Sequence, residues 1–350
     1  MKHTSLFFAM ILAALVFACS KSDSAGGTTP APVNELSGPI QKPVSGYGAD
    51  GKNKVAVISF ASPAYAGKNV DIFYPAGITA PVPVIFYCHP FGGEDSTGNM
   101  GLYEFIAKKG YAVVFSPYPT LNVTVDQRYN CLWLGFKKAV TDYPTIIDTK
   151  KAGFVGYSFG GGAAISLAWR GFVTEGWGAN GRFVFTHAPY YSYQLTDSML
   201  QTFPSNTKLL TEIYDDDVIN DHRMAIDIFR NIAIPAAEKD FLLVKSATIA
   251  GYNYVADHSL PNSRTAFDAY DYYAIYRLLD GLIDYSFNGS ANGKNTALGH
   301  GSAEQVTMPS YNGQTLPALI ETGTPVPLYL QSKYLYSCGD ASNPRVSHCN

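Results

Sequence analysis

The sequence predicts an α/β fold built on a mostly parallel, doubly wound sheet, and three observations support this prediction. From about residue 54 to residue 287, apolar strand-like runs alternate with segments of helical periodicity. Several runs are continuously apolar and rich in β-branched or aromatic residues, as in strands buried on both faces. Apolar residues make up 47% of the 350 residues and charged residues 15%, which suffices for a large core. We therefore expect one eight-stranded sheet with helices on both faces.

The first residues have the pattern of an export signal that ends at a cysteine. A short basic start precedes an almost wholly apolar stretch over residues 5–18, which is too short to span a bilayer comfortably. Cys19 follows directly, and the arrangement resembles the bacterial lipoprotein signal, in which the Cys is lipidated and becomes the mature N-terminus. We expect residues 1–18 to be removed and Cys19 to anchor the protein in the bacterial cell envelope. The alternative is cleavage nearby, which would give a secreted protein with a free Cys19 thiol.

The segments after the signal are assigned from their composition. Residues 19–53 are expected to be a flexible tether, because much of this tract is Ser, Gly, Thr and Pro. The expected strands of the following domain are residues 55–60, 70–74, 84–88, 112–116, 151–157, 182–186, 208–214 and 241–245. The expected helices are residues 100–109, 131–141, 163–170, 223–232 and 267–287.

Residues 288–350 are rich in Gly, Asn, Thr and Pro, and we expect them to form an irregular C-terminal extension, not a second domain. Cys338 and Cys349 flank a short segment near its end. In an exported protein we expect these two residues to form a disulfide. Cys88 and Cys131 lie in apolar stretches and are expected to be buried free thiols.

The strongest catalytic motif is Gly-Tyr-Ser-Phe-Gly at residues 156–160. A predicted strand ends at Gly156, and Gly160 and the small residues after it open a predicted helix. A sharp strand–turn–helix lifts a serine hydroxyl above the edge of the sheet, and small flanking residues let the turn close. We therefore expect Ser158 to be a nucleophile. The alternative is a Gly-rich connection that carries an unused serine.

A second Gly-rich loop, His-Pro-Phe-Gly-Gly at residues 89–93, follows the third predicted strand. One of its backbone amides should join the amide of Phe159 to hold the negative oxygen of a tetrahedral intermediate. Phe91 is the expected donor, because the preceding proline has no N–H. The alternative is a plain loop without this role. His89 and His187 lie at the ends of two predicted strands and are expected to line the substrate pocket or to fill the core.

A serine nucleophile needs a base, and the base needs an orienting carboxylate. His258 lies between the eighth predicted strand and the long predicted helix, which is where the base lies when the chain order is Ser, acid, His. It is therefore the expected base.

The acid should follow the seventh strand, where residues 215–217 are all Asp. The expected pattern is an Asp, a variable residue and two apolar residues; Asp216 fits it best and Asp217 second. The alternatives are a solvated acidic turn or a metal site that includes Asp221 and His222.

Together these features resemble the α/β-hydrolase fold, and within it the branch of dienelactone hydrolases and cutinase-like polyester hydrolases. The resemblance covers about residues 54–287. It rests on the motif at 156–160, on residues 216–219 with the helix after them, and on Asp-His-Ser-Leu-Pro-Asn at 257–262. Ala-Pro-Tyr at 188–190 is similar to the Ala-Pro-Trp substrate-binding segment of the family. The resemblance therefore implies that Tyr190 contacts the substrate, and we expect Tyr157 and Phe91 to line the same cleft.

The sequence thus predicts a serine hydrolase that cleaves carboxylic esters through an acyl-enzyme, with Ser158, His258 and Asp216 as its triad and without a metal or organic cofactor. The expected substrates include bulky or polymeric esters, and the expected oligomeric state is a monomer. The net charge is −3 and no basic run interleaves with aromatic residues, which excludes nucleic-acid binding. Two alternatives remain: a peptidase or acyltransferase that uses the same triad, and a surface-tethered binding lipoprotein with no activity.

Overall fold

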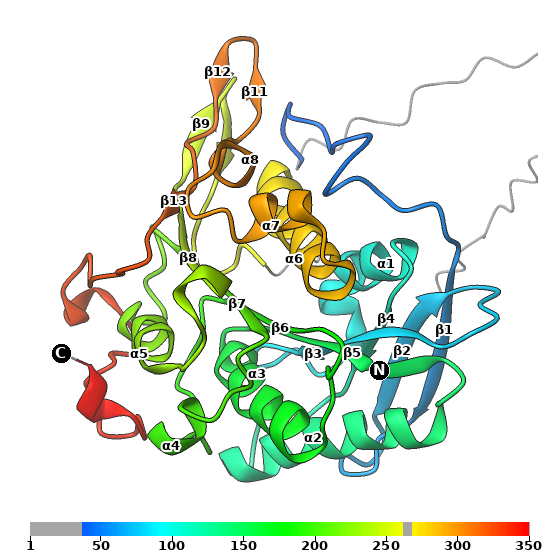
Figure 1. The fold of residues 1–350 in the computed structure, drawn as a ribbon. Helices are drawn as coiled ribbons and strands as arrows, with labels where there is room; N and C mark the ends of the chain where they lie inside the picture. The colour runs from blue at the N-terminus through cyan, green and yellow to red at the C-terminus, as the bar shows by residue number, and fades with distance from the viewer. Residues whose placement is uncertain (1–36, 262–267, 350) are drawn as a thin grey trace, which may run out of the picture. The chain divides into compact units, whose positions relative to one another are not determined.

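The central sheet has nine strands within residues 37–261 and 268–349, which are the residues that the computed structural model describes (Figure 1). Their order across the sheet is β1-β2-β4-β3-β5-β6-β7-β8-β13. The strands are β1 (Val55–Ala61), β2 (Asn69–Pro75), β3 (Val82–Cys88), β4 (Ala112–Phe115), β5 (Ile147–Tyr157), β6 (Arg182–His187), β7 (Thr207–Tyr214), β8 (Lys239–Val244) and β13 (Ile320–Glu321). Each of the first eight lies where the sequence predicts a strand. The expected count of eight is wrong by one, because the C-terminal extension adds β13 to the edge of the sheet.

Most of the sheet is parallel. The pairs β4–β3, β3–β5, β5–β6, β6–β7 and β7–β8 are parallel, and the pairs β1–β2, β2–β4 and β8–β13 are antiparallel. The central strands β3 to β8 therefore all end at one edge of the sheet. In sheets of this kind, ligands bind at the carboxyl ends of the strands.

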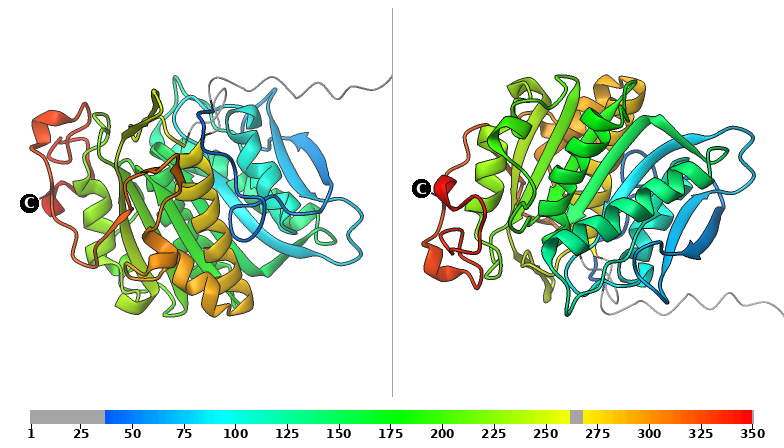
Figure 2. Two further views of the ribbon diagram at one scale, coloured as in Figure 1. Left: turned by 90° about the horizontal axis from the view of Figure 1, so that it is seen from above. Right: turned by 90° about the horizontal axis from the view of Figure 1, so that it is seen from below.

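Helices cover both faces of the sheet, as predicted (Figure 2). Alternate residues of a strand face opposite sides. In β3, Val84 and Phe86 pack with the core under α2 (Val125–Asp142), α3 (Phe159–Trp169) and α5 (Arg223–Asn231). Ile85 and Tyr87 pack with the opposite core, under α1 (Met100–Lys108) and α6 (Arg277–Asn288). The helix expected over 267–287 has a π-helical turn, Asp271–Tyr276, before α6, and residue 267 lies outside the described residues.

Part of the segment expected to be a flexible tether instead packs on the folded domain. Ile40 is 5% exposed, and its N–H donates to the Tyr254 hydroxyl. The Tyr47 hydroxyl donates to Asp284 of α6, and the N–H of Gly48 donates to Asp280. The tether prediction is therefore wrong for this part of the tract, because its apolar and aromatic side chains have partners on the helix layer. The expected signal over residues 1–18 and Cys19 lie outside the described residues.

The C-terminal extension contains more regular structure than its composition predicts. It forms α7 (Ala291–Ala297), α8 (Ala303–Val306), the hairpin β11 (Ser310–Tyr311) and β12 (Gln314–Thr315), and then β13. Three small elements precede it: α4 (Asp197–Leu200) and the hairpin β9 (Ala247–Ile249) and β10 (Tyr252–Tyr254). No helix of the described residues is long and apolar enough to cross a membrane.

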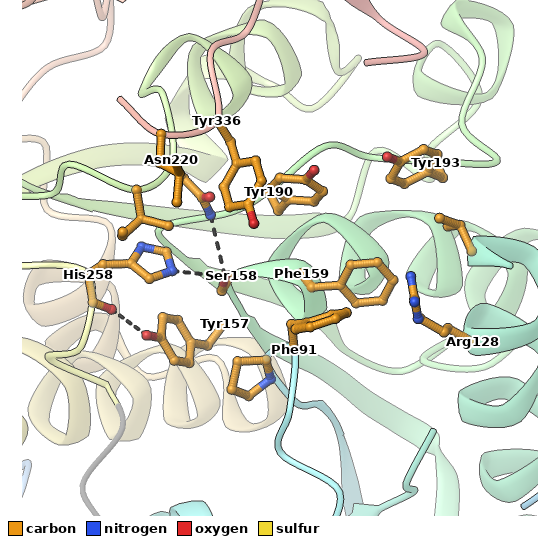
Figure 3. A pocket seen from close by; sticks show the side chains of 14 residues that line it. Phe91, Arg128, Tyr157, Ser158, Phe159, Tyr190, Tyr193, Asn220, His258 and Tyr336 are labelled. Atoms are coloured by element: carbon orange, nitrogen blue, oxygen red, sulfur yellow. Dashed lines mark hydrogen bonds between the residues drawn. The ribbon is translucent and has the colours of Figure 1, made fainter. Parts of the chain in front are cut away.

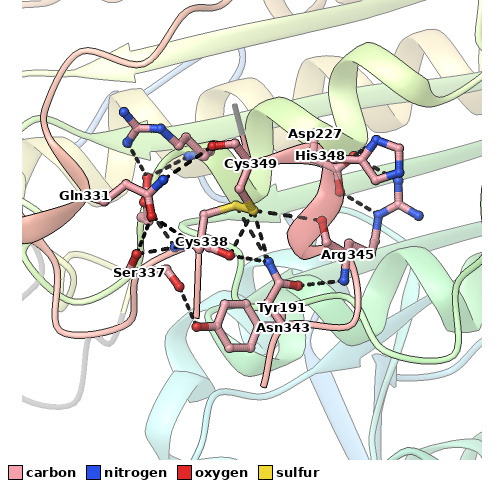
Figure 4. The surroundings of a disulfide bond; sticks show 12 residues. Tyr191, Asp227, Gln331, Ser337, Cys338, Asn343, Arg345, His348 and Cys349 are labelled. Atoms are coloured by element: carbon pink, nitrogen blue, oxygen red, sulfur yellow. Dashed lines mark hydrogen bonds and ion pairs between the residues drawn. A yellow bond between two sulfur atoms is a disulfide. The ribbon is translucent and has the colours of Figure 1, made fainter. Parts of the chain in front are cut away.

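The predicted disulfide between Cys338 and Cys349 is present (Figure 4). Cys88 and Cys131 are buried free thiols, as predicted. Side chains around the disulfide bind the end of the extension to the domain. Arg345 donates to both carboxylate oxygens of Asp227 on α5, at 2.5 and 2.8 Å. The Tyr191 hydroxyl donates to the Ser337 carbonyl at 2.6 Å. The disulfide closes the loop from Cys338 to Cys349, and the buried Arg345–Asp227 pair holds this loop against α5.

Candidate active site

Ser158 occupies a sharp turn between β5, which ends at Tyr157, and α3, which begins at Phe159. Its backbone has φ 55° and ψ −121°, a conformation that is rare and costly for a residue with a side chain. The glycines of the motif make the turn possible. A Cβ on Gly156 would lie 2.2 Å from the Gly160 carbonyl oxygen, and one on Gly160 would lie 1.9 Å from the Cys88 carbonyl oxygen. The motif therefore presents Ser158 at the carboxyl edge of the sheet.

Three side chains form a hydrogen-bonded chain at this edge. Ser158 Oγ lies 2.9 Å from His258 Nε2 (Figure 3), and His258 Nδ1 lies 2.8 Å from Asp217 Oδ2. The Asp217 side chain is fully buried, and its other oxygen accepts hydrogen bonds from the N–H groups of Ile219 and Asn220. These bonds fix the carboxylate so that it orients the imidazole. The geometry is that of a nucleophile, a base and an orienting acid.

The expected acid, Asp216, is not in this chain, and that prediction is corrected to Asp217. Asp216 is exposed, and its carboxylate accepts a hydrogen bond from Ser246 Oγ. The N–H of Asp217 donates to the Tyr214 carbonyl at 3.1 Å, so the chain turns tightly after β7. This turn points Asp216 toward solvent and Asp217 toward His258.

The alternative of a metal site at Asp221 and His222 does not fit the contacts of these two residues. The Asp221 carboxylate accepts from Arg223 and from the N–H of Cys338. His222 Nε2 lies 3.0 Å from the Tyr214 carbonyl oxygen.

A pocket of about 380 Å³ opens at Ser158 and His258. The predicted residues Phe91, Tyr157, Phe159 and Tyr190 all line it (Figure 3). Phe159 is the first residue of α3, where an N–H has no partner inside the helix. Phe91 is 52% exposed at the mouth of the pocket. The two expected amide donors thus lie on the loop after β3 and at the first residue of α3, and both residues border the pocket at Ser158.

The sequence did not predict several other residues of the pocket. Asn220 Nδ2 donates to the Ala188 carbonyl at 2.9 Å and lies 3.4 Å from Ser158 Oγ. The Arg128 guanidinium lies over the rings of Phe91 and Phe159, and no carboxylate of the described residues pairs with it within 4 Å. The predicted helix began at residue 131, whereas α2 begins at Val125. The capping box of Thr124 and Gln127 is the signal that could have placed Arg128 on this helix.

The C-terminal extension supplies one wall of the pocket through Leu335 and Tyr336. The Tyr336 ring meets the Tyr190 ring edge-on, with 5.1 Å between their centroids. The N–H groups of Leu335 and Tyr336 donate to the carbonyls of Val218 and Ile219, both at 2.8 Å. No short-range signal in the sequence points to this contact.

His89 and His187 do not line the main pocket and belong to the interior. Each is 1% exposed. His89 stacks on the Tyr118 ring and accepts from the Tyr118 N–H, and burial lowers its pKa to about 4. His187 lies beside the Tyr214 hydroxyl, and burial lowers its pKa to about 3. The suggestion that they fill the core is the one that the structure supports.

Beneath the site, Glu212 of β7 pairs in register with His187 of β6 and is fully buried. Burial raises the pKa of Glu212 to about 8, and Tyr214 and Arg277 oppose this shift. A carboxyl whose folded pKa is raised holds its proton over a range in which the unfolded chain has lost it. Its contribution to stability is therefore full below pH 4–5 and is lost as the pH rises toward 8.

As the pH rises from 5 to 8, the wild type should lose on the order of 3 kcal/mol of its free energy of unfolding relative to Glu212→Gln. The reason is that the glutamine amide does not ionise in this range. Denaturant unfolding at pH 5, 6.5 and 8 measures this difference. The buried histidines titrate in both proteins, so their effect cancels. Parallel pH profiles for the two proteins would contradict the prediction.

The chain matches no protein-family model, and no curated protein is significantly similar to it. Its function is therefore inferred from the geometry of its own residues.

Proposed function

We propose that the protein is a serine hydrolase of the α/β-hydrolase superfamily that cleaves carboxylic esters. The hydrogen-bonded chain from Ser158 Oγ through His258 to the buried Asp217 carries this proposal, together with the strained turn that holds Ser158. A serine with φ 55° is costly to maintain, and such strain is concentrated at functional sites. The adjoining pocket gives a substrate access to the hydroxyl.

The reaction proceeds through an acyl-enzyme. Ser158 Oγ forms a bond to the ester carbonyl carbon while His258 Nε2 takes the hydroxyl proton, and the amides of Phe91 and Phe159 hold the oxyanion. The intermediate then loses the alcohol, which leaves with the proton from His258. A water molecule attacks the acyl-enzyme with His258 as its base, and the acid and free Ser158 are released. The Asp217 carboxylate orients the imidazole of His258 and stabilises the imidazolium in both halves.

The pocket favours esters with a bulky apolar or aromatic part. Its aromatic lining consists of Phe91, Tyr157, Phe159, Tyr190, Tyr193 and Tyr336. Flat rings offer extensive apolar contact, and an aromatic pair contributes about 0.5–1.5 kcal/mol beyond burial of area. Polymeric esters belong to the proposed substrate class, because Phe91 and Tyr336 are both more than one third exposed and leave the mouth of the pocket accessible.

We expect Tyr190→Ala to lower kcat/KM for benzoate or other bulky esters by about tenfold and to spare acetate esters, because one ring contact is worth about 1.4 kcal/mol. The measurement is kcat/KM for both ester types in both proteins. Tyr311→Ala, on the β11–β12 hairpin and outside the pocket, is the matched control. An equal drop in kcat/KM for both esters would show that Tyr190 does not select between substrates.

A fluorophosphonate probe and a series of p-nitrophenyl esters from C2 to C12 test the proposed activity. The probe should label the wild type and leave Ser158→Ala unlabelled, and the esters should turn over. Labelling with turnover of peptides in place of esters would point to a peptidase. A folded protein that is neither labelled nor active would overturn the proposal in favour of a binding lipoprotein.

The proposal includes the place of the enzyme in the cell. A lipid on Cys19 would hold it at the bacterial envelope, with the domain from residue 37 onward facing ester substrates outside the cytoplasm. An exported protein meets the oxidising conditions that its disulfide needs. The proposed reaction uses side chains, two backbone amides and water.

A further inference from the structure

A second cluster of reactive side chains lies at the opposite edge of the sheet from Ser158. It consists of Asp240 in the amino-terminal half of β8, His300 in the loop between α7 and α8, and Glu321 in β13, and we call it the Asp240 cluster. Glu321 pairs with Leu242, two residues along β8 from Asp240, so both carboxylates lie on the same face of the sheet. Each of the three residues offers one ligand atom, and these atoms all lie within 4.8 Å of one another.

The carboxylate of Asp240 is oriented by bonds to only one of its oxygens. Its side chain is fully buried. Oδ2 accepts from Gln305 Nε2 at 2.6 Å and from the His300 N–H at 3.0 Å. Gln305 is itself fully buried and also donates to the Ala297 carbonyl. This shell aims Oδ1 at the other two members of the cluster, as partners behind a metal ligand do.

Two buried carboxylate oxygens of the cluster residues lack a hydrogen bond. Asp240 Oδ1 and Glu321 Oε1 are buried atoms with no hydrogen-bond partner among the described residues. His300 Nδ1 lies 2.6 Å from Asp240 Oδ1, which is an ion-pair distance without the angles of a hydrogen bond. A buried carboxylate oxygen is costly unless it is paired or coordinates a metal. Both carboxylate oxygens therefore lack the hydrogen bond or metal ion that a buried oxygen needs, and the imidazole nitrogen lies close to one of them.

We propose that Asp240, His300 and Glu321 bind a single Zn²⁺ ion. One imidazole nitrogen and two carboxylate oxygens are ligands that Zn²⁺ accepts in four-coordinate sites. His300 is 43% exposed on its side chain, so water can supply the fourth ligand. Ca²⁺ takes six to eight oxygen ligands and Mg²⁺ an octahedron of oxygens, and the cluster provides neither.

The ion would join three separate parts of the chain. Asp240 belongs to β8, whereas His300 and Glu321 belong to the C-terminal extension, which adds β13 to the sheet beside β8. Zinc would therefore hold the extension to the β8 edge, as the Arg345–Asp227 pair holds it to α5 at another point. Because the cluster and Ser158 lie at opposite edges of the sheet, this role is structural and is independent of the proposed ester hydrolysis.

The test uses full-length, untagged protein that has been stripped with a chelator and titrated with ZnCl₂ by calorimetry. We expect one Zn²⁺ per chain and a rise in Tm of about 5 °C at a hundredfold excess over Kd. His300→Ala should weaken binding by at least about 100-fold and lose the rise in Tm, because loss of a second-shell partner alone costs 10–100-fold. His348→Ala is the control, since His348 also lies beside two carboxylates, Asp197 and Asp227, and its loss should leave binding unchanged.

Asp240→Asn should also abolish binding. If this buried substitution prevents folding, His300→Ala still decides the question, because its side chain is partly exposed. Three results would overturn the proposal: no saturable binding of Zn²⁺ by the wild type, unchanged binding in His300→Ala, or equal stabilisation by Mg²⁺. The first two would leave the cluster as an ion pair between Asp240 and His300.

Discussion

Ser158→Ala should abolish ester hydrolysis while the protein stays folded. Ser158 Oγ is the atom that His258 Nε2 contacts at 2.9 Å, and the alanine keeps the Cβ but has no nucleophile. Loss of the nucleophile from such a triad lowers kcat by on the order of 10⁶. Alanine can occupy the positive-φ turn about as well as serine, so Tm should change little.

Turnover of a p-nitrophenyl ester, circular dichroism and Tm measure this result. Ser259→Ala is the matched control: Ser259 is exposed next to His258, its hydroxyl donates to Asp257, and its loss should leave kcat nearly unchanged. Residual activity of Ser158→Ala above about a tenth of the wild type would assign the chemistry to another residue.

Asp217→Asn should lower kcat by about 10⁴ with little change in KM. The carboxylate accepts from His258 Nδ1 at 2.8 Å, which keeps Nε2 free to take the Ser158 proton. An amide in its place can donate to Nδ1, which favours the wrong tautomer and removes the charge that stabilises the imidazolium.

The neighbouring residue provides the control for this prediction. Asp216→Asn changes the same functional group one position away, at an exposed side chain whose partner is Ser246. We expect its kcat to stay within a few-fold of the wild type. A large drop in kcat for Asp216→Asn, together with a small drop in kcat for Asp217→Asn, would contradict the assignment of Asp217 as the acid.

The strands and the nucleophile were predictable because local pattern determines them. Apolar strand-like runs, several of them continuous, place all eight principal strands. The turn at Ser158 requires glycines in the motif itself, because a Cβ at Gly156 or Gly160 would collide with nearby backbone. His258 followed from chain order. The choice between Asp216 and Asp217 did not, since consecutive Asp residues look alike until the turn after β7 decides which one faces the histidine.

Features that depend on distant partners were beyond sequence reasoning. The two-residue strand β13 has no pattern of its own and exists because Ile320 and Glu321 pair with the edge of β8. Tyr336 reaches the pocket only because its segment bonds to Val218 and Ile219. His187 looked like a pocket residue at a strand end, yet the packing of two layers around it places its ring in the interior.

The wall made by Leu335 and Tyr336 also sets the order in which a newly made chain completes its pocket. Synthesis delivers Ser158, Asp217 and His258 well before residues 335–336, and domains fold largely as their residues become available. A nascent chain that has just passed residue 287 contains Ser158, Asp217 and His258 but not the residues of this side of the pocket. The disulfide that closes the loop after the wall, from Cys338 to Cys349, forms only under oxidising conditions. Leu335 and Tyr336 are therefore the last residues of the pocket to be synthesised.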